Sequence, residues 1–412
     1  MLGQHLPSPV TQKRLRSGPA AGHIDQFADW LHGRGYRQRS LEDLLRGLAG
    51  WTDWMSSAEL TAADVLRAFT ECKARLETTH RVRYARGISR ISIVAASLYI
   101  QFLREQGVIP APDAPPAATE RWPMLDSFRS WMHQHRGLTD STLDLYQGIL
   151  IDFFERLGDD PRRYTADALR AFVFERARPH GIDRAKSIVV AVRALLRFLA
   201  ATGACPAGLE YAIPNFASWE LSSVPRFLKA DDVERVINSC GTDANGLRDR
   251  AVLLLLARLG LRASEVAGLV CTDLDWDNGR IGVCGKGRRR EWLPLPQEVG
   301  VAIRRYLRHG RSPLTTAHVF TKVLAPRGPL TRAAVTHIVR SALRRTGITA
   351  PINGAHVLRH SAATAMLRHG ASLASVAAVL RHRSSRVTMH YAKVDFELLA
   401  EVAQPWPEAL SC

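Results

Sequence analysis

The residues of this sequence that are best suited to chemistry form an ordered set of basic side chains ending in a tyrosine. In chain order they are Arg262, Lys286, His356, Arg359, His382 and Tyr391. A tyrosine hydroxyl has a pKa of about 10, so only about one in a thousand is ionised at neutral pH. It becomes a useful nucleophile beside cations and a proton acceptor. The set supplies both, and it predicts attack by a tyrosine on a phosphodiester.

Two of these residues share one predicted helix. His356 and Arg359 are three apart in a stretch, 355–367, that reads as helix, so both side chains should leave the same face. Arg262 stands at the start of another predicted helix, after the apolar run 251–257. A guanidinium matches phosphate in a bidentate way and keeps its charge. Two of them could therefore bracket the non-bridging oxygens of one phosphate.

Between these helices the sequence predicts three short strands, over 272–277, 280–284 and 289–295. Asn278-Gly279 and Gly285-Lys286-Gly287 separate the strands and are typical of hairpin turns. Lys286 is therefore expected at the tip of a hairpin.

The set as a whole resembles the signature of the tyrosine recombinase, or phage-integrase, family, which is Arg, Lys, His-x-x-Arg, His or Trp, and then Tyr. The resemblance covers roughly 227–402. His382 and Tyr391 are nine positions apart, similar to the family's usual spacing, and Glu265 matches an acidic position often found after the first arginine. One departure is visible. Many members have glycine before the second histidine, where this chain has Arg381.

The resemblance implies a mechanism without metal or cofactor. Tyr391 would attack a DNA phosphodiester to give a 3′-phosphotyrosyl end and a free 5′ hydroxyl, while Arg262 and Arg359 stabilise the transition state. The remaining three residues would handle protons and orientation. His356 is the expected acid/base partner, Lys286 the expected proton donor to the leaving oxygen, and His382 a phosphate-binding or orienting group.

Each residue taken alone has a simpler interpretation. Arg262 could be a solvated surface charge, Lys286 a turn residue and Tyr391 a packing tyrosine. His356 and His360, four apart, could be a metal pair, but the stretch lacks the glutamate of His-Glu-x-x-His. It is the joint order and spacing that favours the recombinase interpretation.

Composition agrees with a nucleic-acid partner. The chain has 412 residues, 56 Lys plus Arg against 39 Asp plus Glu, and a net charge of +17. Such a charge fits double-stranded DNA, whose phosphates release counterions on binding, although a membrane surface would also attract it. The longest apolar run, 251–257, is far shorter than the ~20 residues of a membrane span, and 1–18 has no apolar signal core. We expect a cytoplasmic protein with no membrane partner.

Six scattered cysteines, without a Cys-x-x-Cys pair, argue against a metal cluster or a disulfide scaffold. Proline-rich stretches mark the domain boundaries, and a weak repeat relates 23–110 to 121–208. The predicted fold is mainly α, with two N-terminal helical SAM-like domains and a tyrosine recombinase catalytic domain that carries a small antiparallel sheet. The expected segments are a flexible tail (1–22), the first helical domain (23–110), a linker (111–120), the core-binding domain (121–208), a second linker (209–226) and the catalytic domain (227–412).

The resemblance also implies partners. Two recombination sites, each bound by two protomers, predict a tetramer assembled on DNA, and the first helical domain could clamp DNA or contact other recombinases. The segment 395–402 reads as a short amphipathic helix that could dock on a neighbouring protomer or pack within its own chain. Integration or transposition of a mobile element is the favoured role. Xer-type resolution of replicon dimers and a catalytically silent DNA-binding protein are the alternatives. A type IB topoisomerase shares much of the chemistry but fits the N-terminal modules less well.

Overall fold

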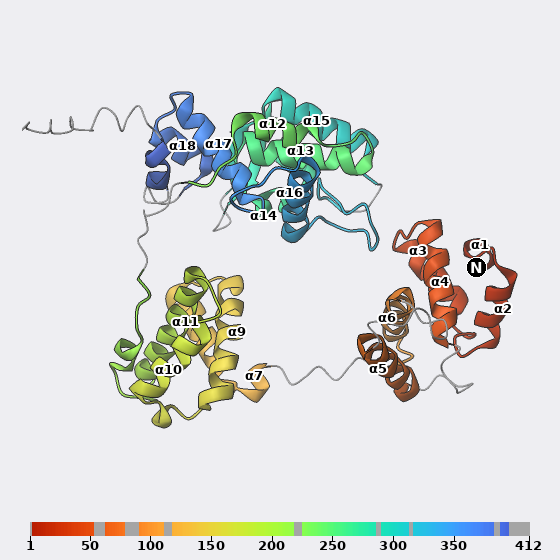
Figure 1. The fold of residues 1–412 in the computed structure, drawn as a ribbon, viewed down its shortest axis with the longest axis horizontal. Coiled ribbons are helices and arrows are strands. Elements are labelled where there is room, and N and C mark those ends of the chain that lie inside the picture. The colour runs from red at the N-terminus through yellow and green to blue at the C-terminus, as the bar shows by residue number, and fades with distance from the viewer. Residues whose placement is uncertain are drawn as a thin grey trace, which may run out of the picture. The chain divides into compact units, whose positions relative to one another are not determined.

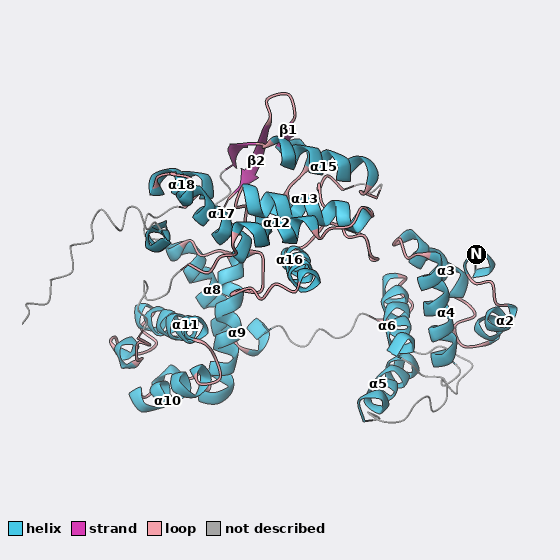
Figure 2. Cartoon of the chain, turned by 45° about the horizontal axis from the view of Figure 1, so that its top comes forward, coloured by secondary structure: helices cyan, strands magenta, loops and turns pink. Residues whose placement is uncertain are grey.

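The fold is mainly helical with one small sheet, as the sequence predicts (Figures 1 and 2). This computed structural model describes residues 2–52, 62–78, 90–110, 118–217, 225–285, 290–312, 316–382 and 388–394. Among the helices in these ranges, none is long and apolar enough to cross a membrane. The predicted helix over 395–402 lies outside the described residues.

The N-terminal region consists of helices packed around one apolar core. They are α1 (Leu2–His5), α2 (Pro9–Ser17), α3 (Ile24–Gly33), α4 (Gln38–Thr52), α5 (Ala62–Thr78) and α6 (Arg90–Glu105). Phe27 meets the ring of Tyr99 edge-on at 5.0 Å and packs against the tilted ring of Phe102 at 5.5 Å, and all three rings are buried. Edge-to-face pairs of this kind add to the stabilisation that burial provides.

The prediction of a flexible tail over 1–22 is wrong. Leu2, Leu6 and Leu15 are fully buried in this first core, and the backbone N–H of Leu2 donates to the Asp25 carboxylate at 2.6 Å. Ser8 caps α2 through its hydroxyl. The apolar residues here are too few and too widely spaced to show helical periodicity, but tertiary burial orders the two short helices.

The second helical region, Pro110–Glu220, is a compact unit. It contains α7 (Ala118–Arg121), α8 (Pro123–Arg136), α9 (Asp140–Leu157), η1 (Pro161–Arg163), α10 (Ala166–Ala177), α11 (Ile182–Ala201) and η2 (Leu209–Ala212). Pro123 opens α8, and Gly137 ends it with φ +57, a left-handed conformation that favours glycine. One face of α9 is buried in the core of this unit: Leu143, Tyr146, Ile149, Leu150, Phe153 and Phe154.

The C-terminal region holds the residues predicted to do chemistry. Its helices are α12 (Ala230–Asn238), α13 (Ala244–Arg258), α14 (Ala263–Gly268), η3 (Cys271–Asp273), α15 (Gln297–His309), α16 (Arg332–Thr346), α17 (His356–Arg368), α18 (Leu373–Leu380) and η4 (His390–Val394). Helix α13 packs against α15, α16 and α17. It is covered on several sides, so its sequence is a continuous apolar run rather than an amphipathic pattern.

The sheet has the order β1-β2-β3 with antiparallel neighbours, formed by β1 (Leu274–Asp275), β2 (Arg280–Cys284) and β3 (Arg290–Pro294). The three predicted strands are confirmed, and the first is shorter because η3 occupies its start. Lys286 lies outside the described residues, in the interval between β2 and β3.

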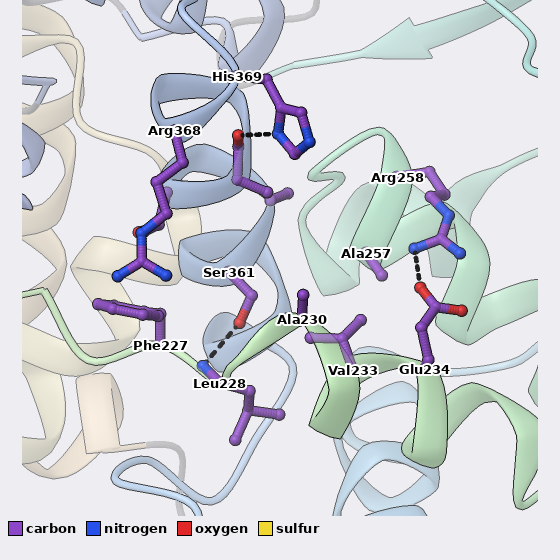
Figure 3. Close-up of a pocket in the computed structure, with 13 residues that line it drawn as sticks. Phe227, Leu228, Ala230, Val233, Glu234, Ala257, Arg258, Ser361, Arg368 and His369 are labelled. Atoms are coloured by element: carbon purple, nitrogen blue, oxygen red, sulfur yellow. Dashed lines mark hydrogen bonds and ion pairs between the residues drawn. The ribbon is translucent and has the colours of Figure 1, made fainter. Parts of the chain in front are cut away.

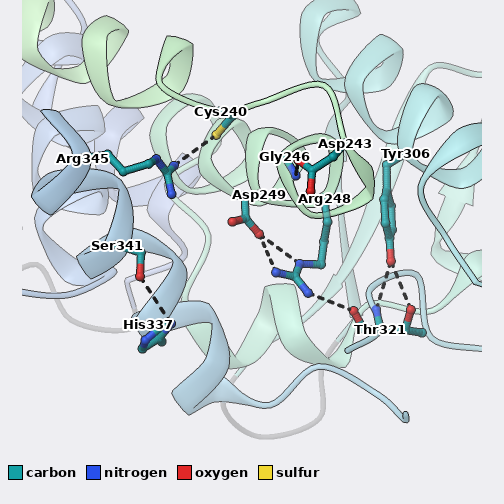
Figure 4. A network of polar contacts seen from close by, with 10 residues as sticks. All are labelled: Cys240, Asp243, Gly246, Arg248, Asp249, Tyr306, Thr321, His337, Ser341 and Arg345. Atoms are coloured by element: carbon teal, nitrogen blue, oxygen red, sulfur yellow. Dashed lines mark hydrogen bonds and ion pairs between the residues drawn. The ribbon is translucent and has the colours of Figure 1, made fainter. Parts of the chain in front are cut away.

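A buried polar network joins α13 and α15 to the segment before α16 (Figure 4). Arg248 pairs with Asp249 at 2.7 Å, and both side chains are nearly buried. The hydroxyl of Tyr306 lies 3.2 Å from Oγ1 of Thr321 and accepts the backbone N–H of the same residue at 3.2 Å. Polar groups buried here are thus paired, which anchors the loop to the core.

A pocket of about 240 Å³ opens between α12, α13 and α17 (Figure 3). The backbone N–H of Leu228 donates to the hydroxyl of Ser361 at 2.9 Å, and the guanidinium of Arg368 lies 5.0 Å from the ring of Phe227. These contacts fasten the segment before α12 onto α17. The predicted site residues are not among those that line the pocket.

Candidate active site

Helix α17 begins at His356, and its first two turns carry three residues of the site. The predicted helix over 355–367 is confirmed. His356 is exposed at the start of the helix, whereas Arg359 is only 3% exposed. The rings of His356 and His360, one turn apart, are 4.7 Å apart and meet edge-on. The first turns of α17 therefore present two imidazoles together with one buried guanidinium.

Arg359 is fixed by two backbone carbonyls. It donates to the carbonyl of Gly260 and, at 2.5 Å, to that of Leu380. Gly260 has φ +58, and a Cβ there would lie 2.5 Å from Leu380, so the close approach requires glycine. Burial, and then repulsion from Arg262, lowers the pKa of Arg359 to about 10, which leaves it charged at neutral pH.

Arg262 is the more accessible of the two predicted arginines. It precedes α14, and its backbone N–H donates to the Glu265 carboxylate at 2.7 Å. Nη1 of Arg262 donates to the other oxygen of the same carboxylate at 2.7 Å. Its side chain is 32% exposed, whereas that of Glu265 is 3% exposed. The guanidinium is thus anchored from the protein side and open on the other.

The turn after α18 keeps the left-handed conformation that glycine would adopt there. Arg381 has φ +55 and ψ +49 and is the one non-glycine residue with positive φ in the described part of the chain. Its backbone carbonyl accepts from Nη2 of Arg262 at 3.4 Å. The next residue, His382, places Nδ1 2.9 Å from Oγ1 of Thr388. Arg381 therefore adopts a backbone conformation that favours glycine.

Tyr391 is buried, and its hydroxyl lies 2.7 Å from Nδ1 of His360. Burial raises the pKa of Tyr391 to about 12, against a lowering by Arg359. Burial, and then the charge of His356, lowers the pKa of His360 to about 4. At neutral pH both groups are uncharged, so the hydroxyl donates to Nδ1 when the ring carries its proton on Nε2.

The other two histidines are also held in their neutral forms. The ring of His382 is parallel to that of Tyr391 at 6.3 Å, and burial, followed by the charge of Arg359, lowers its pKa to about 4. The pKa of His356 is lowered first by desolvation and then by the charges of Arg359 and Arg262. A phosphate bound among these rings would raise their pKa values again, because an opposite charge favours the protonated form.

The structure therefore brings together five of the six predicted residues from α14, α17, the end of α18 and η4. His360 was considered in the sequence only as a metal partner of His356, and its contact with Tyr391 depends on the path of the chain after α18. The same holds for the contacts of Arg381. Among the residues that the structure describes, no group of three or more His, Cys, Asp or Glu side chains could hold a metal ion.

The charges of the site suit an anionic ligand. The guanidiniums of Arg262 and Arg381 donate to the carboxylate of Glu265, and that of Arg359 interacts with the same carboxylate electrostatically. The cluster keeps a net positive charge, and a tyrosine hydroxyl with a proton acceptor lies beside it. Charged donors placed around a nucleophile in this way are what phosphoryl transfer requires. Tyr391 is 3% exposed, so it must become accessible before it can attack.

Comparison with known proteins gives consistent matches. The model of the phage integrase family matches residues 226–397. A putative integrase/recombinase, y4rA, from Sinorhizobium fredii is 36% identical over 403 residues and covers 96% of each chain. Among solved structures, the XerH site-specific recombinase bound to its palindromic difH substrate has a TM-score of 0.54 at 19% identity, covering 75% of this chain and 94% of the other. The Tn1549 transposon integrase in complex with circular intermediate DNA has a TM-score of 0.52 at 17% identity, covering 68% and 99%.

Proposed function

Because the chain belongs to the phage integrase family of tyrosine site-specific recombinases, we propose that Tyr391 cuts and rejoins DNA through a 3′-phosphotyrosyl intermediate. The observation that carries this proposal is the Tyr391 hydroxyl, held 2.7 Å from the His360 ring beside the guanidiniums of Arg262 and Arg359. The hydroxyl has a proton acceptor, and the two arginines supply the charge that a phosphodiester needs.

The bond changes of the proposed step are simple. The Tyr391 oxygen forms a bond to phosphorus, and the bond from phosphorus to the 5′ oxygen breaks. Arg262 and Arg359 stabilise the additional negative charge on the non-bridging oxygens of the transition state. Because the phosphotyrosine preserves the energy of the diester, a second DNA end can reverse the step by attack of its 5′ hydroxyl. Neither a metal nor a nucleotide is required by this chemistry.

The proton of Tyr391 goes to His360 in this proposal. His360 is the histidine in contact with the Tyr391 hydroxyl, whereas the ring of His356 contacts the ring of His360. We assign His356 to phosphate binding and to tuning the charge of His360, and His382 to orienting the phosphate beside Tyr391. This arrangement gives His360 the acid/base role that the sequence suggested for His356.

Substitution of His360 tests the route of this proton. A glutamine can accept a hydrogen bond from Tyr391 but cannot take up its proton, so His360→Gln and His360→Ala should both slow formation of the covalent adduct by about 10²-fold or more. The measurement is the single-turnover rate of adduct formation at several pH values. Wild type should lose rate as acid protonates His360, because a protonated ring cannot accept.

The glutamine variant should lack this acidic limb. His369→Gln, at an exposed histidine at the end of the same helix, is the matched control and should behave like wild type. A glutamine variant that retains the wild-type rate would reduce His360 to an orienting role.

Lys286 is proposed to protonate the departing 5′ oxygen. Lys286→Ala should be slow on ordinary DNA and largely restored on a substrate whose bridging 5′ oxygen is replaced by sulfur, a leaving group that needs little protonation. Tyr391→Phe should stay inactive on both substrates. Equal defects of the lysine variant on both substrates would assign Lys286 to binding instead.

The substrate is double-stranded DNA in the cytoplasm, and integration or transposition of a mobile element is the favoured role. The net charge of +17 supports a polyanionic substrate, and y4rA, which matches along the whole chain, carries the name integrase/recombinase. Resolution of replicon dimers is the second candidate, because a tyrosine recombinase named XerD is 29% identical over 68% of this chain.

DNA from the flanks of the gene, nicked beside the cleaved phosphate, should trap the covalent adduct if the protein acts in integration or transposition. Trapping only on replicon-borne sites would favour the second.

The domain roles complete the proposal. The core-binding domain, 121–208, is proposed to grip the DNA face opposite the catalytic domain, and a tetramer is proposed to assemble on two paired sites. The first helical domain, 23–110, is either a further DNA clamp or a surface for partner recombinases. A clamp contributes to the salt dependence of DNA affinity, whereas a protein-interaction surface does not.

A further inference from the structure

We propose that Arg381 is a positioning residue that acts through Glu265 to hold Arg262 ready for the phosphate. The inference rests on the proposed function, because Arg262 is assigned there to charge stabilisation. It concerns a position whose left-handed backbone conformation favours glycine and at which this chain has arginine.

The backbone at Arg381 shows that the side chain is held by its surroundings. With φ +55 it occupies the left-handed region, where a Cβ comes close to the following carbonyl oxygen. Glycine would adopt this conformation without that cost. An unfavourable backbone conformation persists where the surrounding contacts determine it, and such residues gather at functional sites.

The side-chain contacts of Arg381 identify what holds it. The side chain is 3% exposed, and one guanidinium nitrogen donates to Oε2 of Glu265 at 2.8 Å. The other terminal nitrogen donates to the carbonyl of Val379 at 2.9 Å. A guanidinium removed from water is tolerated when a carboxylate pairs with it and further hydrogen bonds satisfy its donors. Glu265 is that carboxylate. These two bonds satisfy the terminal nitrogens of Arg381, whereas its Nε is buried without a hydrogen-bond partner among the described residues.

Glu265 connects this buried arginine to the accessible one. Its Oε1 accepts from Nη1 of Arg262, and its Oε2 accepts both from the Arg262 backbone and from Arg381. In the opposite direction, the Arg381 carbonyl accepts from Nη2 of Arg262 at 3.4 Å. The Arg381 side chain therefore holds Arg262 through the shared carboxylate, while the main-chain carbonyl of residue 381 holds it directly.

Sharing one carboxylate between two guanidiniums has an electrostatic consequence. If Glu265 were paired with Arg262 alone, its negative charge would neutralise the positive charge of Arg262 that is proposed to stabilise the phosphate. With Arg381 as a second partner, the group of three residues keeps a net charge of one, and the exposed guanidinium of Arg262 carries the accessible part of it. A glycine at position 381 would keep the turn but lose this second partner.

The test uses the full chain and measures DNA affinity and the single-turnover rate of adduct formation separately. Arg381→Gly suits the turn, so the variant should fold and bind DNA nearly as wild type does. Its cleavage should be slower by roughly 10- to 100-fold, by analogy with the loss seen when the hydrogen-bond partner of a metal ligand is removed. Arg381→Lys keeps a charge beside Glu265 and should recover part of the rate. Arg381→Met, which has no charge, should not.

A substrate with a neutral methylphosphonate at the cleaved position separates this role from a merely structural one. A neutral diester needs less positive charge, so the defect of Arg381→Gly should shrink on it, as should that of Arg262→Ala. In a Glu265→Gln background, Arg381→Gly should cause little further loss, because the shared carboxylate is already gone. An equal defect on both substrates, or additive losses in the two backgrounds, would overturn the inference.

Failure of the inference is distinguishable from failure of the proposed function. If wild type forms adduct and Arg262→Ala slows it while Arg381→Gly keeps the wild-type rate, only the role of Arg381 is wrong. If wild type forms no adduct on its own sites, the proposed function is wrong. If Arg381→Gly fails to fold, the cleavage rates of Arg381→Lys and Arg381→Met are compared on both substrates instead. Equal rates for these two variants would overturn the inference.

Discussion

Replacing Tyr391 with phenylalanine should abolish the covalent protein–DNA adduct while leaving DNA binding nearly intact. Only the nucleophilic oxygen is removed, and with it one hydrogen bond to His360, whose net contribution to stability is about 0.5–1.5 kcal/mol. The adduct is measured on nicked DNA by denaturing gel, and binding is measured by titration with the same DNA.

Tyr306→Phe provides the matched control. Tyr306 is also a buried tyrosine of the C-terminal region whose hydroxyl is hydrogen-bonded, in this case to Thr321. It should lower stability by a similar amount and leave the adduct unchanged. Adduct formation by Tyr391→Phe would show that the nucleophile is another residue.

Arg262→Ala should slow cleavage by about 10²- to 10³-fold, because removing one donor that stabilises transition-state charge typically has this effect. Its side chain is partly exposed and already anchored by Glu265, so the fold should survive. Arg258→Ala is the control, since Arg258 is a similarly exposed arginine that pairs with Glu234 of α12 and Glu298 of α15, outside the site. A loss under threefold for Arg262→Ala would contradict the assignment.

Arg359→Ala should show a comparable loss of rate together with a loss of stability. Its guanidinium is buried, and the carbonyls of Gly260 and Leu380 would each lose a donor. An unsatisfied buried acceptor costs about 1–3 kcal/mol. The thermal midpoint of Arg359→Ala should therefore fall clearly below that of Arg262→Ala, although both affect the same chemical step. Equal midpoints would mean that Arg359 is not held as described.

The catalytic region was predictable because its sequence patterns are local. The helix that begins at His356, the helix start after Arg262 and the three strands follow from apolar periodicity, from turn residues and from a continuous apolar run at α13. The order of the basic residues and Tyr391 then suggested the chemistry. The roles of these residues remain proposals that the substitutions above test.

The features that were not predicted depend on tertiary structure. His360 contacts Tyr391 only because η4 returns to α17, and Arg381 reaches Glu265 across 116 positions of sequence. Neither contact leaves a local pattern. The prediction of a flexible tail was wrong for a related reason. Leu2, Leu6 and Leu15 become buried only against helices formed by later residues. Whether such a side chain is buried or exposed depends on which later segments of the chain pack against it.

Mapping the trapped adduct tests the central claim most directly. Wild-type protein is trapped on nicked DNA, digested with protease and nuclease, and the modified peptide is sequenced by mass spectrometry. The account predicts a nucleotide joined through its 3′ phosphate to the peptide that contains Tyr391. A nucleotide on any other residue, or one joined through a 5′ phosphate, would contradict it.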